Sequence, residues 1–305
     1  MIRTTLFAAA ALSTLLIGMP AIASGNPDCA LAERYLALAE KASNELNQTE
    51  AVDLLEKAVG ICPSFEANMR LGEISADIPD NAYAERAAVA LNDAYQLAAT
   101  PEDQARAVAR YAQLLHETNH SQKALKYAYT ARNLDPGNAE ILALANRIGE
   151  AAKEITSEEI VRGFGELSLK PLALKVDTDA APESGAGSNA PPRASINIPL
   201  QFEFGTTTLT ASSRRNISVL AETLAQQLGG QKVLFVGHAD VRGSETYNLN
   251  LSLARAQAIR NRVLDLQPAL AGQISVAGKG ETQPLSLGTE ESDHQINRRL
   301  EIVAQ

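Results

Sequence analysis

The spacing of hydrophobic and polar positions changes along the chain, and this change divides it into segments. Over residues 28–153 apolar residues recur at intervals of three and four, which predicts helices. From Ser195 to Phe204 apolar and polar positions alternate, which predicts a strand. Between these parts, residues 177–193 read DTDAAPESGAGSNAPPR and have no apolar period, which is typical of a flexible linker. The pattern therefore predicts a multidomain protein with an all-α first half.

Small residues repeat at intervals of 36 and 37 residues within the helical half. Each copy has two small residues seven positions apart, a proline five or seven positions later, and another small residue twelve positions earlier. Facing small residues let two helix axes approach closely, and proline cannot continue a helix. The pattern predicts antiparallel helix pairs, with Pro79 interrupting the second pair and a capping helix over 138–153 that begins at Asn138. The copies are Ala39, Ala51, Ala58 and Pro63; Ser75, Ala87, Ala94 and Pro101; and Ala112, Ala124, Ala131 and Pro136.

This spacing resembles the tetratricopeptide repeat (TPR), although alanine or serine replaces the glycine usual in the first helix. An ordinary helical bundle is the alternative. The resemblance implies a TPR-like domain over residues 28–155, with a concave surface for a protein partner that the sequence does not identify. In this arrangement Cys29 and Cys62 lie at adjacent ends of the first helix pair. We expect a disulfide between them in an oxidising compartment, because no neighbouring group would activate either thiol.

The first 23 residues have the features of a cleaved export signal. Arg3 precedes an apolar run over residues 6–17, and Ala-Ile-Ala at 21–23 has the small side chains of a cleavage site. A membrane anchor is the alternative, but it needs about 20 apolar residues, and Pro20 follows this shorter run. Cys29 does not directly follow small apolar residues, so a lipoprotein anchor is a poor fit. We therefore expect export without an anchor, to the periplasm.

Composition excludes several classes of function. The net charge of the 305 residues is -9, and an acidic chain is repelled by phosphates, so we do not expect a nucleic-acid partner. Only 4% of the residues are aromatic, and alanine-based packing favours close helix contacts over large ligand pockets. Two cysteines and four scattered histidines do not suggest a metal site. We expect no cofactor. The sequence has no nucleophile or carboxylate pair at a spacing that would indicate catalysis, so we do not expect an enzyme.

The second half alternates predicted strands with predicted helices. A short helix over 157–164 precedes the linker, which we extend over residues 156–195. The order β-α-β-α-β-β over residues 196–305 predicts a layered α/β sandwich. The predicted strands are 195–204, 232–236, 273–277 and 299–303, and the predicted helices are 209–228 and 245–266.

An ordered set of residues in this half resembles a known family. Gly237-His238-Ala239-Asp240 ends the second strand, and Gly243-Ser244-x-x-Tyr247-Asn248-x-x-Leu251-Ser252-x-x-Arg255-Ala256 continues into the helix. Gly278-x-Gly280-Glu281-x-x-Pro284 and Asn297-Arg298-Arg299-x-Glu301 follow. Residues 196–305 thus resemble the OmpA-like C-terminal domain, which is also found in peptidoglycan-associated lipoproteins and flagellar stator proteins.

The resemblance implies binding of the peptidoglycan stem peptide at its diaminopimelate residue. By analogy, Asp240 takes the ammonium group of that residue, and Arg255 takes its carboxylate through two parallel hydrogen bonds. Asn248, Asn297 and Arg298 are expected to border the same cleft. An internal salt bridge between Asp240 and Arg255 is the structural alternative.

The remaining motif residues have simpler interpretations. Gly237 and Gly243 are expected to satisfy turn geometry, and His238 is expected to pack on the sheet rather than act in catalysis. Ala239 stands where the family usually has threonine. We therefore predict a non-catalytic adaptor that holds the cell wall and a protein partner, or alternatively a protein scaffold whose OmpA-like domain no longer binds the wall.

Overall fold

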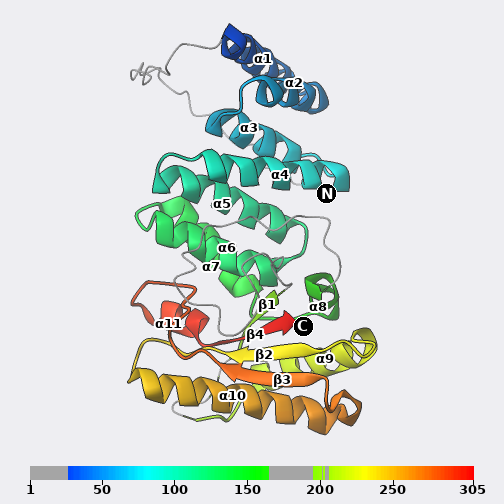
Figure 1. Ribbon diagram of the computed structural model, residues 1–305, viewed down its shortest axis with the longest axis vertical. Helices are drawn as coiled ribbons and strands as arrows, with labels where there is room; N and C mark the ends of the chain where they lie inside the picture. Colours follow the sequence, from blue (N-terminus) through cyan, green and yellow to red (C-terminus); the bar gives the residue numbers. More distant parts are fainter. Residues whose placement is uncertain (1–26, 165–194, 201, 203–205) are drawn as a thin grey trace, which may run out of the picture.

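The computed structural model describes residues 27–164, 195–200, 202 and 206–305. These residues form a stack of helices and an α/β domain that follows the stack along the long axis of the molecule (Figure 1). This multidomain architecture is the predicted one. Within the described ranges, we find no helix that has both the length and the apolar character needed to cross a bilayer. The predicted export signal and residues 177–193 of the predicted linker lie outside these ranges.

Helices α1 to α7 build the stack, and consecutive helices pack as pairs, with α7 closing the series (Figure 1). The Asn138 side chain caps α7 by accepting hydrogen bonds from the amides of Glu140 and Ile141, as predicted. The predicted short helix is present as α8 (Ser157–Phe164). The stacked helices are α1 (Pro27–Asn44), α2 (Gln48–Ile61), α3 (Phe65–Ala76), α4 (Asn81–Leu97), α5 (Pro101–Glu117), α6 (Ser121–Leu134) and α7 (Ala139–Ala151).

The small residues of the repeated pattern lie where the helices of the stack meet. All nine, eight alanines and Ser75, are at most 1% exposed. Their burial confirms the predicted helix-pair packing. Pro63 and Pro136 follow the ends of α2 and α6, as predicted. Pro79 and Pro101 differ from the prediction, because Pro79 lies in the turn between α3 and α4 and interrupts neither helix, while Pro101 begins α5. The missing amide of proline is harmless at a first helical position, since that group has no partner inside the helix.

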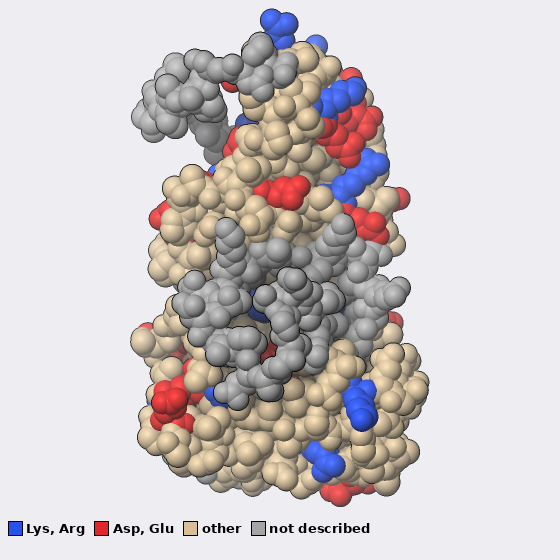
Figure 2. All heavy atoms as spheres, viewed as in Figure 1, with Lys and Arg blue, Asp and Glu red and all other residues tan. Residues whose placement is uncertain are grey.

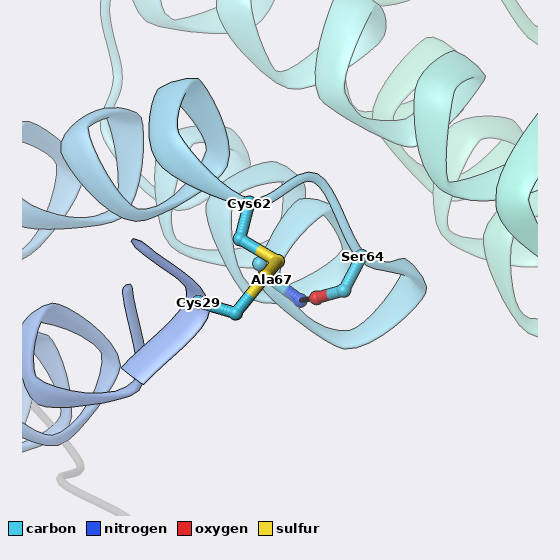
Figure 3. The surroundings of a disulfide bond; sticks show 4 residues. All are labelled: Cys29, Cys62, Ser64 and Ala67. Carbon is cyan, nitrogen blue, oxygen red and sulfur yellow. Dashed lines mark hydrogen bonds between the residues drawn. A yellow bond between two sulfur atoms is a disulfide. The ribbon is translucent and has the colours of Figure 1, made fainter. Parts of the chain in front are cut away.

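The predicted disulfide joins the two ends of the first helix pair. Cys29 lies in the first turn of α1 and Cys62 directly follows α2, and their Cα atoms are 5.1 Å apart (Figure 3). Ser64, two residues further on, accepts a hydrogen bond from the Ala67 amide at 3.2 Å and so begins α3. The crosslink therefore fixes the start of α1 next to the turn that leads into the second pair.

A four-stranded mixed sheet forms the α/β domain, in the order β1-β4-β2-β3. β4 is antiparallel to both β1 and β2, whereas β2 and β3 are parallel. Side chains of α9 and α10 share one buried cluster with alternate residues of the strands, such as Ile196, Phe235 and Ile302. The elements are β1 (Ser195–Pro199), α9 (Ala211–Gln227), β2 (Val233–Gly237), α10 (Glu245–Leu266), the single 3-10 turn η1 (Pro268–Leu270), β3 (Ile274–Gly278), α11 (Glu291–Asn297) and β4 (Arg299–Ala304).

The repeat stack and the α/β domain touch each other directly. α6 lies against the edge strand β1, and α8 packs against β1 and α9. Leu285 and Ile296 of the α/β domain join the hydrophobic cluster of the stack. A flexible linker would allow the two domains to lie apart. The structure places them in contact, because the α/β domain completes the apolar surface of α6 and α7.

Charged side chains of both signs lie beside each other along the stack (Figure 2). Arg70 lies 3.6 Å from Glu40 and 3.0 Å from Glu66, and Arg86 lies 3.3 Å from Glu56. Exposed pairs of this kind each contribute little to stability. The stack is therefore stabilised mainly by its buried apolar contacts.

Candidate functional site

The motif residues lie where β2 passes into α10. Gly243 in the connecting loop has a φ of 119°, a backbone conformation that favours glycine. Ser244 then caps α10 by accepting a hydrogen bond from the Tyr247 amide at 3.3 Å. The predicted turn role of Gly243 is confirmed.

Gly237 has a different role from the predicted one. A Cβ atom there would lie 2.0 Å from the backbone oxygen of Ser252 on α10. Gly278, its pairing partner on β3, would place a Cβ atom 2.7 Å from the backbone nitrogen of Leu253. The two glycines let α10 rest directly on the ends of β2 and β3. This contact holds the first turns of α10 beside the loop that carries Asp240.

A cleft of about 590 Å³ opens at this end of the sheet. It contains four of the five predicted binding residues and not the fifth, Asn297. Its walls come from the segment after β1, the end of β2, the first half of α10, and the region of α11. The lining residues are Phe202, Ala239, Asp240, Arg242, Tyr247, Asn248, Leu251, Arg255, Glu291 and Arg298.

Asp240 is held by two arginines, and neither of them is Arg255. Arg298 Nη1 donates to Asp240 Oδ2 at 2.7 Å, and Arg242 donates to the same carboxylate from Nη2 at 2.8 Å and from Nε at 3.0 Å. Burial alone would raise the pKa of the Asp240 carboxyl, but the hydrogen bonds from Arg242 and Arg298 outweigh burial and hold this pKa well below its usual range. Asp240 is therefore ionised at neutral pH.

Glu291 of α11 completes this group of charges, because it binds the same two arginines as Asp240. Arg242 Nη1 donates to Glu291 Oε2 at 2.9 Å, and Arg298 Nη2 donates to Glu291 Oε1 at 2.8 Å. Two carboxylates thus alternate with two guanidinium groups around the rim of the cleft.

Arg255 is the buried cation of the cleft. It is 6% exposed, its guanidinium lies 4.7 Å from the centre of the Phe202 ring, and Nε donates to the Thr206 backbone oxygen at 3.4 Å. Among the described residues, no carboxylate lies within ion-pair distance of it, Asp240 included. Burial and the positive charge of Arg298 lower the pKa of Arg255. A buried guanidinium without an anion is unfavourable, so this position suits the carboxylate of a ligand.

The two predicted asparagines have different surroundings. Asn248 lines the cleft, and its Nδ2 donates to the Asp240 backbone oxygen at 3.1 Å and to the Glu281 carboxylate. Asn297 is 1% exposed; its Oδ1 accepts from the amides of residues 285–286 at 2.8 and 3.0 Å, and its Nδ2 donates to the Ser286 oxygen at 2.8 Å. Asn297 therefore shapes the loop behind the cleft and does not line the cleft itself.

His238 packs on the sheet, as predicted. It is 2% exposed, and its Nε2 lies 3.2 Å from Glu301 Oε2. Burial and the charge of the neighbouring Arg299 lower the pKa of His238 to about 4. The ring is therefore neutral at neutral pH and takes no part in the cleft.

Three residues that line the cleft were not predicted from the sequence, namely Arg242, Glu291 and Phe202. Arg242 follows Asp240 by two positions, and an arginine so close to a binding carboxylate was the available signal. Glu291 offered no signal, because 49 residues separate it from Arg242. Phe202 was assigned to a strand interior, whereas it forms an isolated bridge with Leu209 and faces Arg255.

A larger cavity of about 730 Å³ lies between α7, α9 and α11, at the boundary of the two domains. Two of its charged residues, Lys153 and Glu150, already pair with each other at 2.5 Å. The smaller cleft is the better candidate, because it carries the buried Arg255 and the motif residues. In the part of the chain that the structure describes, histidine, cysteine and carboxylate side chains form no group of three or more that could hold a metal ion.

The comparison with protein families identifies the class of this domain. The model of the OmpA family matches residues 201–298. The C-terminal part of the chain is therefore an OmpA domain, and the resemblance inferred from the motif around Asp240 and Arg255 is confirmed.

Among characterised relatives, the chain is 34% identical over 101 residues to the peptidoglycan-associated lipoprotein of Pseudomonas aeruginosa, a match covering 33% of this chain and 58% of the relative. It is 31% identical over 102 residues to the lipoprotein of the same name from Legionella pneumophila, covering 33% of this chain and 57% of the relative. It is 27% identical over 106 residues to outer membrane porin F of Pseudomonas aeruginosa, covering 35% of this chain and 30% of the porin. The chain thus spans less than two thirds of the length of these relatives.

Solved structures give similar matches. The peptidoglycan-associated lipoprotein from Burkholderia pseudomallei is 27% identical and has a TM-score of 0.31, covering 37% of this chain and 91% of that one. The cell wall anchor of the T6SS from Pseudomonas aeruginosa is 25% identical and has a TM-score of 0.32, covering 38% of this chain and 82% of that one.

Proposed function

We propose that this protein is a non-catalytic adaptor of the bacterial cell envelope. Its OmpA domain binds the stem peptide of peptidoglycan at the diaminopimelate residue, and its helical repeats bind a protein of the envelope. Exported by a signal over residues 1–23, it resides in the periplasm in contact with the cell wall. The names of its relatives, which describe association with peptidoglycan and with the outer membrane, support this assignment.

The observation that carries the proposal is the state of Arg255. This guanidinium is buried, it faces the cleft, and it has no anionic partner among the described residues. A ligand carboxylate would neutralise it through two parallel hydrogen bonds. Asp240 lines the same cleft, and its carboxylate can bind an ammonium group of the ligand. The Arg242 side chain is 47% exposed and so has room to move aside for this ammonium group. A zwitterionic amino acid matches both charges.

Cosedimentation with purified sacculi tests this proposal. We expect wild-type protein to be retained, and Arg255→Ala and Asp240→Ala to lose at least about tenfold in affinity, since removing one partner of a buried charge pair costs 2 kcal/mol or more. Arg262→Ala is a matched control, because Arg262 is exposed on the same helix and lies outside the cleft. Its retention should equal that of wild type. A wild-type protein that stays in the supernatant, or equal retention of all four proteins, contradicts wall binding.

Ala239 favours the second candidate, an envelope scaffold without wall binding. Its buried methyl group lies in the cleft beside Asp240, where the family usually supplies a hydroxyl. The scaffold predicts no retention on sacculi together with a stable protein complex. Copurification from envelopes after mild crosslinking distinguishes the candidates, because it reports the wall fragments and the partner of the repeats in one experiment.

A further inference from the structure

We propose that the helical repeats set the geometry of the cleft through Arg132 and Asn133 at the end of α6. These two residues hold the segment 285–297, which carries Glu291 and leads directly into Arg298. The inference rests on the proposed function, because the effect it describes is on binding of the wall peptide.

Asn133 holds the start of this segment through two hydrogen bonds. Its Nδ2 donates to the Leu285 backbone oxygen at 2.8 Å, and its Oδ1 accepts from the Leu287 amide at 3.0 Å. Arg132 forms an ion pair with Asp293, a carboxylate that is fully buried, and lies 3.4 Å from Ser286 Oγ. Side chains of α6 thus bind two backbone groups, one hydroxyl and one carboxylate of the segment.

Apolar contacts support the same attachment. Leu285 is 8% exposed and Ile296 is 5% exposed, and both belong to the hydrophobic cluster of the repeats. Gly149 of α7 lies where a Cβ atom would be 3.6 Å from Ile296 Cδ1 and 3.1 Å from the Tyr129 hydroxyl. The segment is therefore packed into the stack as well as hydrogen-bonded to it.

The segment is rigid enough to transmit this attachment to the cleft. Asn297 binds the backbone of residues 285–286, as described above, and Ser286 Oγ donates to Asp293 Oδ1 at 2.6 Å. The Glu290 amide donates to the other Asp293 oxygen at 3.0 Å. These bonds tie both ends of the segment together, so a shift at Leu285 also moves α11.

α11 presents different sides to the two domains. Asp293 and Glu291 are two positions apart, and such residues do not share a face of a helix. Asp293 meets Arg132 of the repeats, while Glu291 meets Arg242 and Arg298 at the rim of the cleft. Releasing α11 from α6 would therefore misplace Glu291 and Arg298, and with them the partners of Asp240. Arg132 and Asn133 act as positioning residues, since neither touches the cleft.

The test measures the affinity of the full chain for a soluble stem tripeptide that contains meso-diaminopimelate, by titration calorimetry. We expect Asn133→Ala to bind about tenfold more weakly, a coupling of ordinary size between two sites. Asn133→Ala leaves no buried charge unpaired, so the variant should fold. Asn216→Ala is the matched control. Asn216 also crosses the domain boundary, donating to the Lys153 backbone oxygen at 2.8 Å, but this hydrogen bond does not involve residues 285–298. It should keep wild-type affinity.

Two further measurements separate positioning from a loss of stability. Arg132→Lys keeps a cation beside Asp293 and should recover most of the affinity that Arg132→Ala loses. Coupling is also reciprocal, so the tripeptide should slow hydrogen exchange of the Leu287 amide in wild type and not in Asn133→Ala. If Asn133→Ala and Arg132→Ala bind like Asn216→Ala, the positioning role is wrong while wall binding stands. If wild type does not bind the tripeptide, the proposed function fails and this inference fails with it.

Discussion

Arg255 and Asp240 differ in how far the described residues around them neutralise their charges. Asp240 accepts hydrogen bonds from two arginines, whereas Arg255 contacts an aromatic face and a backbone oxygen. The three arginines and two carboxylates of the cleft leave an excess of one positive charge among its lining residues. At the scale of single residues, we therefore expect the cleft to bind a ligand carboxylate most strongly, with an ammonium group of the ligand adding selectivity.

Gly237 allows a residue-scale prediction about the support of the cleft. Gly237→Ala would push a Cβ atom against the Ser252 backbone oxygen, 2.0 Å away, and α10 would have to move. We expect a loss of about 3 kcal/mol in the free energy of unfolding, at the upper end of overpacking costs. Urea unfolding followed by circular dichroism measures it.

Gly60→Ala is the control for this substitution. Gly60 lies inside α2 with no atom within 4 Å of an added Cβ. Alanine there should be neutral or stabilise by about 0.5–1 kcal/mol, because glycine is unfavourable within helices. Equal effects of the two substitutions would show that close contact between α10 and β2 does not matter.

At the scale of elements, the sequence predicted those helices and strands that local hydrophobic periodicity encodes. The helix over 245–266 was predicted with its observed bounds, because its apolar residues recur over many turns. α11 was missed, since seven residues are too few to establish a period. The pairing of Arg132 with Asp293 was also missed, because 161 residues separate them and nothing in the sequence around either residue indicates a buried ion pair. Four of the five residues predicted to bind the wall peptide line the cleft, Asn297 does not, and the arginine partners of Asp240 were not foreseen.

The disulfide gives a prediction for the first helix pair. Cys29 and Cys62 enclose a loop with a sequence separation of 33. Removing the crosslink by the double substitution Cys29→Ser, Cys62→Ser should cost about 3–4 kcal/mol by the loop-entropy relation. In a stack where each pair contacts only its neighbours, the loss should appear mainly in α1 and α2. Hydrogen exchange should show faster exchange there than in α5 and α6.

A reducing agent provides the control for the disulfide. It should reproduce the effect in wild type and leave the double variant unchanged. Uniformly faster exchange over all helices would contradict a local role.

At the scale of the whole molecule, the buried His238 links stability to pH. Its pKa is about 4 in the folded state, below the ordinary value of about 6.5. Between these two pKa values, the unfolded chain binds a proton at His238 that the folded protein does not bind. The contribution of His238 to the free energy of unfolding is therefore fully present above about pH 6.5 and is lost as the pH falls towards 4. The pKa values of Asp240 and Asp293 are lowered, so their contributions are lost only below about pH 4.

We expect wild type to lose about 3 kcal/mol of unfolding free energy between pH 7 and pH 4. His238→Gln should lose far less over the same range. Urea titrations at pH 7, 5.5 and 4.5 provide the measurement. The same decline in the glutamine variant would assign the pH dependence to other groups. Because Leu285 and Ile296 are shared between the domains, the decline should be visible in probes on the repeats as well.

The Cys29–Cys62 crosslink and the OmpA domain lie at opposite ends of the helical stack (Figure 1). A linear array of helices frays from its ends, where the outermost pair has a neighbour on one side only. Here one end is closed covalently and the other is closed by a folded domain. In the proposed adaptor, a force between the cell wall and the far end of the stack would therefore act on a helical array that is closed at both ends. The middle helices should then be the first to unfold.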